Sequence, residues 1–192
     1  MALPLPLEIA EAAFRCAPAV PALRRVKPEL MHLTLAFLGR TPDERLAEVA
    51  AAAEAAASDV TAFDVELDHA GHFPRHRAPR VVWLGVGAGA PAVLALGERV
   101  RAELGRRAIS YDEPAKPVQA HVTLGRVREN VDPAEARVIA AGVEAMRIPH
   151  LRFRVDGVVV FESVLSPRGP KYHPRATAPL RVVSGNRPGL AG

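Results

Sequence analysis

Apolar and polar positions repeat with two different periods along this 192-residue chain. Alternation at every second residue is typical of a strand with one buried face, whereas spacing of three and four residues is typical of an amphipathic helix. Strands are therefore expected at 63–67, 80–86, 153–155 and 158–161, and helices at 7–16 and 92–107. The segments 69–79 and 110–119 are rich in Pro, Gly and charged residues and are predicted to be loops.

Two segments of the chain repeat one order of motifs. Each begins with His-x-Thr. A residue that can cap a helix follows, with Pro directly after it and Glu three residues after it, and an apolar-patterned stretch comes next. Thr41 and Asp132 are the N-cap candidates, with Pro42 and Pro133 in the first helical position. The repeat predicts helices over 42–58 and 133–146, each preceded by a strand, and an α+β architecture of two related lobes.

The two His-x-Thr motifs carry the candidate chemistry. Residues two apart on a strand point to the same side, so His32 lies beside Thr34, and His121 beside Thr123. Two related lobes that meet would bring two imidazoles and two hydroxyls into one cleft. Hydroxyls donate hydrogen bonds to phosphate oxygens, while one neutral and one protonated imidazole supply a base and an acid. Such a cleft suits a phosphate ester.

The segments His32-Leu-Thr-Leu-Ala-Phe-Leu-Gly39 and His121-Val-Thr-Leu-Gly-Arg-Val127 resemble the paired signatures of the two-histidine (2H) phosphoesterases. The branch most similar is the RNA 2′,3′-cyclic phosphodiesterases, also described as 2′-5′ RNA ligase-like. The resemblance extends over 72–85 and 163–172. It implies one bilobal α+β domain over 1–183, with antiparallel sheets around a central cleft, helices outside, and no metal or other cofactor.

The resemblance also implies an activity and its residues. The expected reaction is hydrolysis of a 2′,3′-cyclic phosphate, on RNA ends or nucleotides, to a 2′-phosphate. His32 and His121 would be catalytic, and Thr34 and Thr123 would bind the phosphate. His32 is assigned as the acid and His121 as the base, and the pseudo-symmetry leaves the reverse assignment open. A nucleotide- or RNA-binding module with little catalysis, and a reversible 2′-5′ RNA ligase, are the alternatives.

Three further substrate-binding residues are expected from the resemblance. Arg126 would bind phosphate, although it comes five residues after His121 and its strand parity points it away unless the strand twists or ends. Phe73 and Tyr172 would stack on a base. Trp83, within an apolar run, is expected in the core rather than as a ligand platform.

One departure concerns the start of the chain. Family members open with an apolar strand, whereas Met1-Ala-Leu-Pro begins where that strand usually ends. We therefore expect a shortened first strand or an upstream start. His69, His72 and His76 have a spacing that suggests metal ligands, but Gly and Pro residues interrupt any helix there and disfavour a metal site. Instead, a basic rim of the cleft or a solvent-facing surface is expected from His72, Arg75, His76 and Arg77.

The composition excludes some classes of protein but does not by itself identify a function. The net charge is +4, the pI is about 9.8, and only three of the 25 basic residues are lysines. Arginine suits phosphate ligands, and a GC-rich genome explains its excess equally well. The single Cys16 cannot form an intramolecular disulfide, so a cytoplasmic location is expected. A monomer is also expected. The chain offers no apolar run of membrane-spanning length and no P-loop, and residues 184–192 are expected to be disordered.

Overall fold

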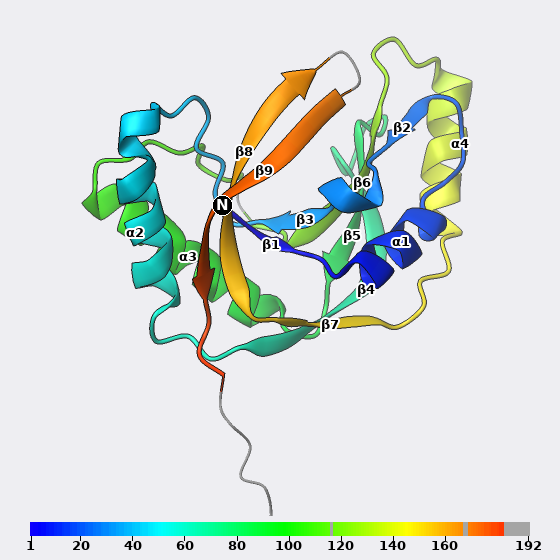
Figure 1. Ribbon diagram of the computed structural model, residues 1–192. Coiled ribbons are helices and arrows are strands. Elements are labelled where there is room, and N and C mark those ends of the chain that lie inside the picture. The colour runs from blue at the N-terminus through cyan, green and yellow to red at the C-terminus, as the bar shows by residue number, and fades with distance from the viewer. Residues whose placement is uncertain (116, 167–168, 183–192) are drawn as a thin grey trace, which may run out of the picture.

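The computed structural model describes residues 1–115, 117–166 and 169–182 (Figure 1). Its helices are α1 (Leu7–Cys16), α2 (Leu46–Ala57), α3 (Ala90–Arg106) and α4 (Pro133–Glu144), with 3-10 turns at Pro28–Leu30 and Asp43–Arg45. Its strands are β1 (Ala2–Pro4), β2 (Leu23–Arg25), β3 (His32–Thr34), β4 (Phe63–Phe73), β5 (Val81–Val86), β6 (His121–Val127), β7 (Leu151–Val155), β8 (Gly157–Ser166) and β9 (Gly169–Pro179).

The strands form one curled antiparallel sheet in the order β7-β4-β5-β6-β3-β1-β8-β9, with β2 paired to β6. The two His-x-Thr strands, β3 and β6, are neighbours at its centre. Strands from each half of the chain join the sheet of the other half: β4, which follows α2, pairs with β7, and β8, which follows α4 and β7, pairs with β1. The predicted α+β class with two related lobes is confirmed, and each lobe contains strands from both halves of the chain.

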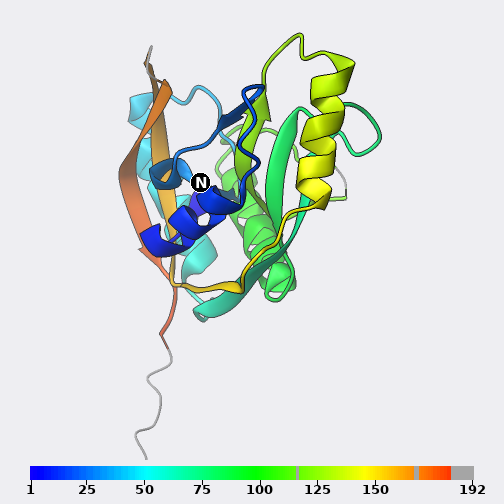
Figure 2. The same cartoon turned by 90° about the vertical axis from the view of Figure 1, so that its right-hand side faces the viewer.

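One face of this sheet is buried under the helices. Leu3, Leu33, Leu84 and Val122, from four adjacent strands, are each at most 1% exposed. Helix α2 packs on α3 and on β8 and β9, whereas α4 packs on β4 and α1 on β7, so the helices stand in two pairs (Figures 1 and 2). Full burial of each such side chain stabilises the fold by about 1.5–3 kcal/mol. The core thus occupies one side of the central strands and leaves the other side for polar groups.

The predicted strands and helices are present, with changes at their ends. The expected loop at 69–79 is wrong in its first part, because β4 continues to Phe73 and pairs with β5 along that length. This extension depends on Gly71, where a Cβ atom would come within 2.3 Å of the Trp83 ring. Short strands such as β1 and β2, at three residues each, have too few positions to show a period.

The two predicted helix caps differ in outcome. The Asp132 carboxylate accepts hydrogen bonds from the Ala134 and Glu135 amides, both at 2.8 Å, and caps α4 as predicted. The expected cap at Thr41 is wrong: its hydroxyl donates to the Leu38 carbonyl, and a 3-10 turn separates it from α2. With Pro42 extended, the chain enters the helix through the 3-10 turn rather than directly.

The first strand is short and nevertheless continuous with the sheet. All three residues of β1 pair with β3, and Ala2 also pairs with Val159 of β8. The Met1 amino group is buried and donates to the Ala36 carbonyl at 2.7 Å. Within the described residues, no helix combines the length and apolar character needed to cross a bilayer. The predicted disordered tail at 184–192 lies outside them.

Candidate active site

The sheet brings the two His-x-Thr motifs side by side. Leu33 of β3 pairs with Val122 of β6, and both side chains lie in the core. Continuing this antiparallel register by one residue places His32 opposite Thr123 and Thr34 opposite His121. Directly opposed residues in such a pair have Cβ atoms about 4.5–5.5 Å apart. All four polar side chains therefore share the face opposite the core, which we call the site face.

Each histidine ring is held by a backbone carbonyl two residues before it. Nδ1 of His32 lies 2.9 Å from the Leu30 oxygen, and Nδ1 of His121 lies 2.8 Å from the Gln119 oxygen. Because a carbonyl oxygen only accepts, Nδ1 carries the proton in both rings. In the neutral rings Nε2 then has a free lone pair, and within the described chain neither Nε2 is bonded to another group. The pair thus presents two equivalent nitrogens for proton transfer.

Both histidines favour the neutral state. Burial lowers the pKa of His32, and the charges of the chain's amino terminus and of His121 lower it further. Burial also lowers the pKa of His121, and the Arg126 guanidinium adds to that effect. The influence of His121 on the pKa of His32 is a consequence of their proximity. Both rings are therefore available as proton acceptors near neutral pH.

Each histidine is flanked by aromatic rings from a hairpin of its own lobe. The Phe73 and His121 ring centroids are 5.2 Å apart, and Trp83 lies 6.1 Å from His121. On the other side, Tyr172 lies 5.3 Å from His32, and Phe161 lies 6.2 Å from it. Phe73 and Tyr172, both predicted from the sequence, thus reach the site from β4 and β9.

Two of these aromatic residues were not predicted in the site. Trp83 is buried as expected, at 3% exposure, but its ring packs beside His121 rather than away from it. Phe161 lies relative to His32 much as Trp83 lies relative to His121, because each is the more distant and tilted of the two rings beside its histidine. Sequence could have indicated Phe161 because it ends the apolar run of β8 as Phe73 ends β4, but only the strand pairing shows that both runs border the site.

A β-bulge places Arg126 on the site face, against the expected parity. Trp83 pairs with Thr123, but Val82 pairs with Gly125, so β6 contains one extra residue between these pairs. The extra residue turns Arg126 to the side of Thr123, opposite Val81. Val81 in turn pairs with Phe73. Arg126 therefore lies one row of residues beyond Thr123, and its charge reaches His121.

Gln119 connects His121 to a second layer of polar residues. Its carbonyl holds the His121 ring, and its side-chain nitrogen lies 3.3 Å from Nε2 of His69. Nδ1 of His69 lies 2.6 Å from the Asp68 carboxylate, and Arg75 donates to the Gln119 side-chain oxygen at 3.0 Å. This network fixes the residue that orients His121. This contact of His69 was not predicted from the sequence, where His69 is considered only as a metal ligand.

The arrangement can bind an anion and move protons at two points. The hydroxyls of Thr34 and Thr123 have no hydrogen-bond partner among the residues that the structure describes, so they can donate to a ligand. Arg126 adds a positive charge on the same face. No group of three or more His, Cys, Asp or Glu side chains suited to a metal ion occurs within the described ranges, His69, His72 and His76 included.

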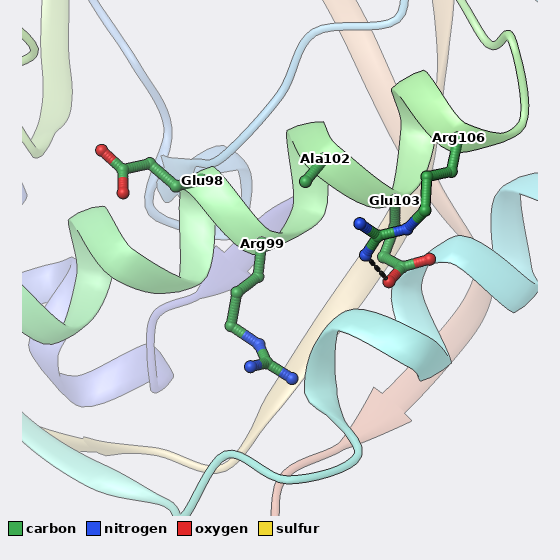
Figure 3. Close-up of a pocket in the computed structure, with 5 residues that line it drawn as sticks. All are labelled: Glu98, Arg99, Ala102, Glu103 and Arg106. Atoms are coloured by element: carbon green, nitrogen blue, oxygen red, sulfur yellow. Dashed lines mark hydrogen bonds and ion pairs between the residues drawn. The ribbon is translucent and has the colours of Figure 1, made fainter.

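Two hollows lie away from His32 and His121. One, of about 360 Å³ along α3, is bordered by Glu98, Arg99, Ala102, Glu103 and Arg106 (Figure 3). Glu103 pairs there with Arg106 and with Arg107, which lower its pKa to about 2. The other, of about 390 Å³, lies between the 75–79 loop and α4 and contains the basic residues His72, Arg75, His76, Arg77 and Arg137. Neither hollow includes a His-x-Thr residue.

Comparison with known sequences identifies a matching family. The family model described as the 2′-5′ RNA ligase superfamily matches residues 4–165. An RNA 2′,3′-cyclic phosphodiesterase from Thermotoga maritima is 33% identical, over 77% of this chain and 74% of that protein. A protein of the same name from Archaeoglobus fulgidus is 32% identical, over 80% of this chain and 81% of that protein.

Solved structures with the same fold agree with the sequence matches. The protein TT0787 of Thermus thermophilus superimposes with a TM-score of 0.75 at 29% identity, over 94% of this chain and 96% of that chain. LigT of E. coli, crystallised with 3′-AMP, superimposes with a TM-score of 0.71 at 26% identity, over 93% of this chain and 95% of that chain.

Proposed function

The chain belongs to the 2′-5′ RNA ligase superfamily, and from that premise we propose that it is a phosphodiesterase that opens the 2′,3′-cyclic phosphate of RNA ends or nucleotides. The observation that carries the proposal is the pairing of Leu33 with Val122, which sets both His-x-Thr motifs on one face with each Nε2 free. The expected product is a 2′-phosphate with a free 3′-hydroxyl.

The reaction needs a base and an acid on opposite sides of phosphorus. Nε2 of one neutral histidine takes a proton from water as the water oxygen attacks phosphorus. The bond from phosphorus to the 3′ oxygen breaks, and Nε2–H of the other, protonated histidine gives its proton to that oxygen. The base ends protonated and the acid ends neutral, so one water is added and no net proton is released.

We assign His121 as the base and His32 as the acid, and the pseudo-symmetry of the two motifs leaves the reverse assignment open. Arg126 disfavours a proton on His121, which suits a base. The negative charge of the bound phosphate raises the pKa of the nearby His32, offsetting the effect of its burial. The Thr34 and Thr123 hydroxyls donate to the non-bridging oxygens, and the positive charge of Arg126 on the same face favours binding of the anion. Phe73 and Tyr172 contact the nucleoside.

The test is turnover of 2′,3′-cyclic AMP in the presence of EDTA, with the product isomer identified by chromatography. His32→Ala and His121→Ala are each expected to lower kcat/KM about 100-fold to 10,000-fold, because each removes one proton-transfer group. EDTA is expected to leave the wild-type rate unchanged, since the two histidines, two threonines and Arg126 supply the groups that the reaction needs.

His150→Ala is the matched control, because His150 is 94% exposed and bonds Glu66 rather than the site. Circular dichroism of every variant checks that the fold is retained. Full activity in either site variant would refute the assignment. Tight binding of adenosine 2′-phosphate by the wild type with no turnover at any pH would identify a binding module instead.

A further inference from the structure

We propose that Arg24 and Arg126 form a second anion site, which binds a phosphate on the 5′ oxygen of the nucleoside whose cyclic phosphate is cleaved. This inference rests on the proposed function. It concerns a part of the substrate other than the cyclic phosphate, which the two His-x-Thr motifs bind. Arg24 is on β2, the short strand that pairs with β6 beyond the end of β3.

The register of β2 puts the two arginines directly opposite each other. Arg24 pairs with Arg126, and the flanking Leu23 pairs with Val127, whose side chains pack with the core. Arg24 and Arg126 therefore share the site face with the two histidines. Phe73, Val81, Arg126 and Arg24 form one continuous row across β4, β5, β6 and β2. This row lies next to the row that contains Thr123.

Like charges in opposed positions destabilise a sheet. In the part of the chain that the structure describes, neither Arg24 nor Arg126 has a carboxylate partner. The arginines at 45, 106, 107, 128, 152, 154 and 175 each pair with a carboxylate, whereas Arg24, Arg126 and several other exposed arginines of the described chain do not. A bound anion between the two guanidinium groups would remove the repulsion, and planar guanidinium groups bind phosphate through two parallel hydrogen bonds.

Arg24 also spans the two lobes at this end of the site. Its Nη2 atom lies 3.1 Å from the position that a Cβ atom would occupy on Gly169, at the start of β9. The guanidinium group thus extends from a strand of the His121 lobe to the hairpin that supplies Tyr172. A ligand held there would contact both hairpins that border the histidines.

The chemistry of the substrate identifies the second phosphate. A 2′,3′-cyclic phosphate occupies both lower hydroxyls of the ribose, so the remaining attachment point is the 5′ oxygen. A phosphate at that position is either the linkage to the preceding nucleotide of an RNA or a terminal 5′-phosphate. Because of the bulge, Arg126 lies one row beyond Thr123 on the site face, so an anion held by Arg24 and Arg126 is separate from one held at Thr123, as the two phosphates of one nucleotide are.

The test compares three substrates with the same reacting group: adenosine 2′,3′-cyclic phosphate, its 5′-phosphorylated form, and adenylyl-(3′→5′)-adenosine 2′,3′-cyclic phosphate. We expect Arg24→Ala to lower kcat/KM for the 5′-substituted substrates, relative to the unsubstituted one, about tenfold, equivalent to about 1.4 kcal/mol. Loss with the dinucleotide alone identifies the internucleotide linkage as the ligand, and loss with both identifies the 5′-phosphate group in either form.

Arg25→Ala is the control, because Arg25 is adjacent in sequence but lies with its guanidinium 4.2 Å from the Phe14 ring, on the other side of β2. In Arg25→Ala, the ratio of kcat/KM for the 5′-substituted substrates to kcat/KM for the unsubstituted substrate should stay within about twofold of the wild-type ratio. An unchanged ratio in Arg24→Ala would overturn the inference. So would an equal loss on all three substrates, which would place Arg24 at the cyclic phosphate or in the folding of the chain.

A binding measurement separates this inference from the activity. If the wild type hydrolyses none of the three substrates, the proposed function fails, but the second site remains testable with adenosine 2′,5′-bisphosphate and adenosine 2′-phosphate. Calorimetry should then show tighter binding of the bisphosphate by about tenfold in the wild type and no such difference in Arg24→Ala. Equal affinities in the wild type would reject the site itself.

Discussion

His32 and His121 have nearly the same local environment although they lie in different halves of the chain. In each, Nδ1 donates to the carbonyl two residues earlier, and burial lowers the pKa. The charges differ: Arg126 acts on His121, whereas the amino terminus and His121 act on His32. The two rings are therefore similar in geometry and distinct in electrostatics, as a reaction with one acid and one base requires.

The pH dependence of kcat/KM should be bell-shaped with its maximum below about pH 6.5, the ordinary pKa of imidazole. The acid must be charged, so activity falls as pH rises through its lowered pKa, and the base must be neutral, so activity falls as pH drops through its own. Rates with 2′,3′-cyclic AMP at constant ionic strength check this. A maximum above pH 7.5 would contradict the lowered pKa values.

The same shifts affect stability in a defined direction. Below about pH 6.5 the unfolded chain binds protons at these histidines more readily than the folded chain does. The free energy of unfolding contributed by the two rings is therefore complete above that pH and decreases as pH falls toward the lowered values. A bound phosphate anion, which favours the charged rings, should reduce this decrease.

Among the elements, the two repeated helices begin in different ways. The Asp132 carboxylate bonds two free amides of α4, whereas Thr41 lies outside α2, beyond a 3-10 turn. The motif Thr/Asp-Pro-x-Glu therefore has the same sequence pattern in both halves and caps a helix in one of them. The entry to α2 depends on how the chain leaves β3, which the motif does not describe.

Asp132→Ala should lower the free energy of unfolding by about 1 kcal/mol, because two amides at the start of α4 lose their acceptor. Thr41→Ala, the matched variant from the other repeat, should change it by less than about 0.5 kcal/mol. Urea denaturation followed by circular dichroism measures both. Equal losses in the two variants would show that Thr41 also caps its helix in solution.

At the scale of the whole molecule, the exchange of strands joins the lobes into one unit. Because β5 pairs with β6, β4 with β7 and β8 with β1, each half of the chain completes the sheet of the other. The site lies at the junction, where β3 meets β6. Neither lobe can therefore unfold without removing strands that the other lobe needs.

Unfolding should be a single transition. Trp83, the only tryptophan, reports on the His121 lobe, whereas far-ultraviolet circular dichroism reports on helices of both lobes. Because the sheet is continuous, the urea midpoints from tryptophan fluorescence and circular dichroism should coincide. A fluorescence transition at lower urea than the circular dichroism transition would show that the lobes unfold separately.

The sequence determined the local features of this protein, because these depend on residues close together in the chain. A period of two places the His and Thr of each motif on one face of a strand. Asp132 caps helix α4, and the repeated order of motifs predicts two related lobes. Burial of Leu33 and Val122 follows from the same alternation. These features sufficed to predict the fold class and the candidate catalytic residues.

Tertiary structure decided which segments meet. The bulge that turns Arg126 toward Thr123 and the pairing of Arg24 with Arg126 both depend on hydrogen bonds between strands distant in sequence. Register is set by packing across the whole sheet, and one inserted residue reverses the face of every residue beyond it. For that reason the sequence could identify the two histidines, and only the assembled sheet could show which arginines accompany them.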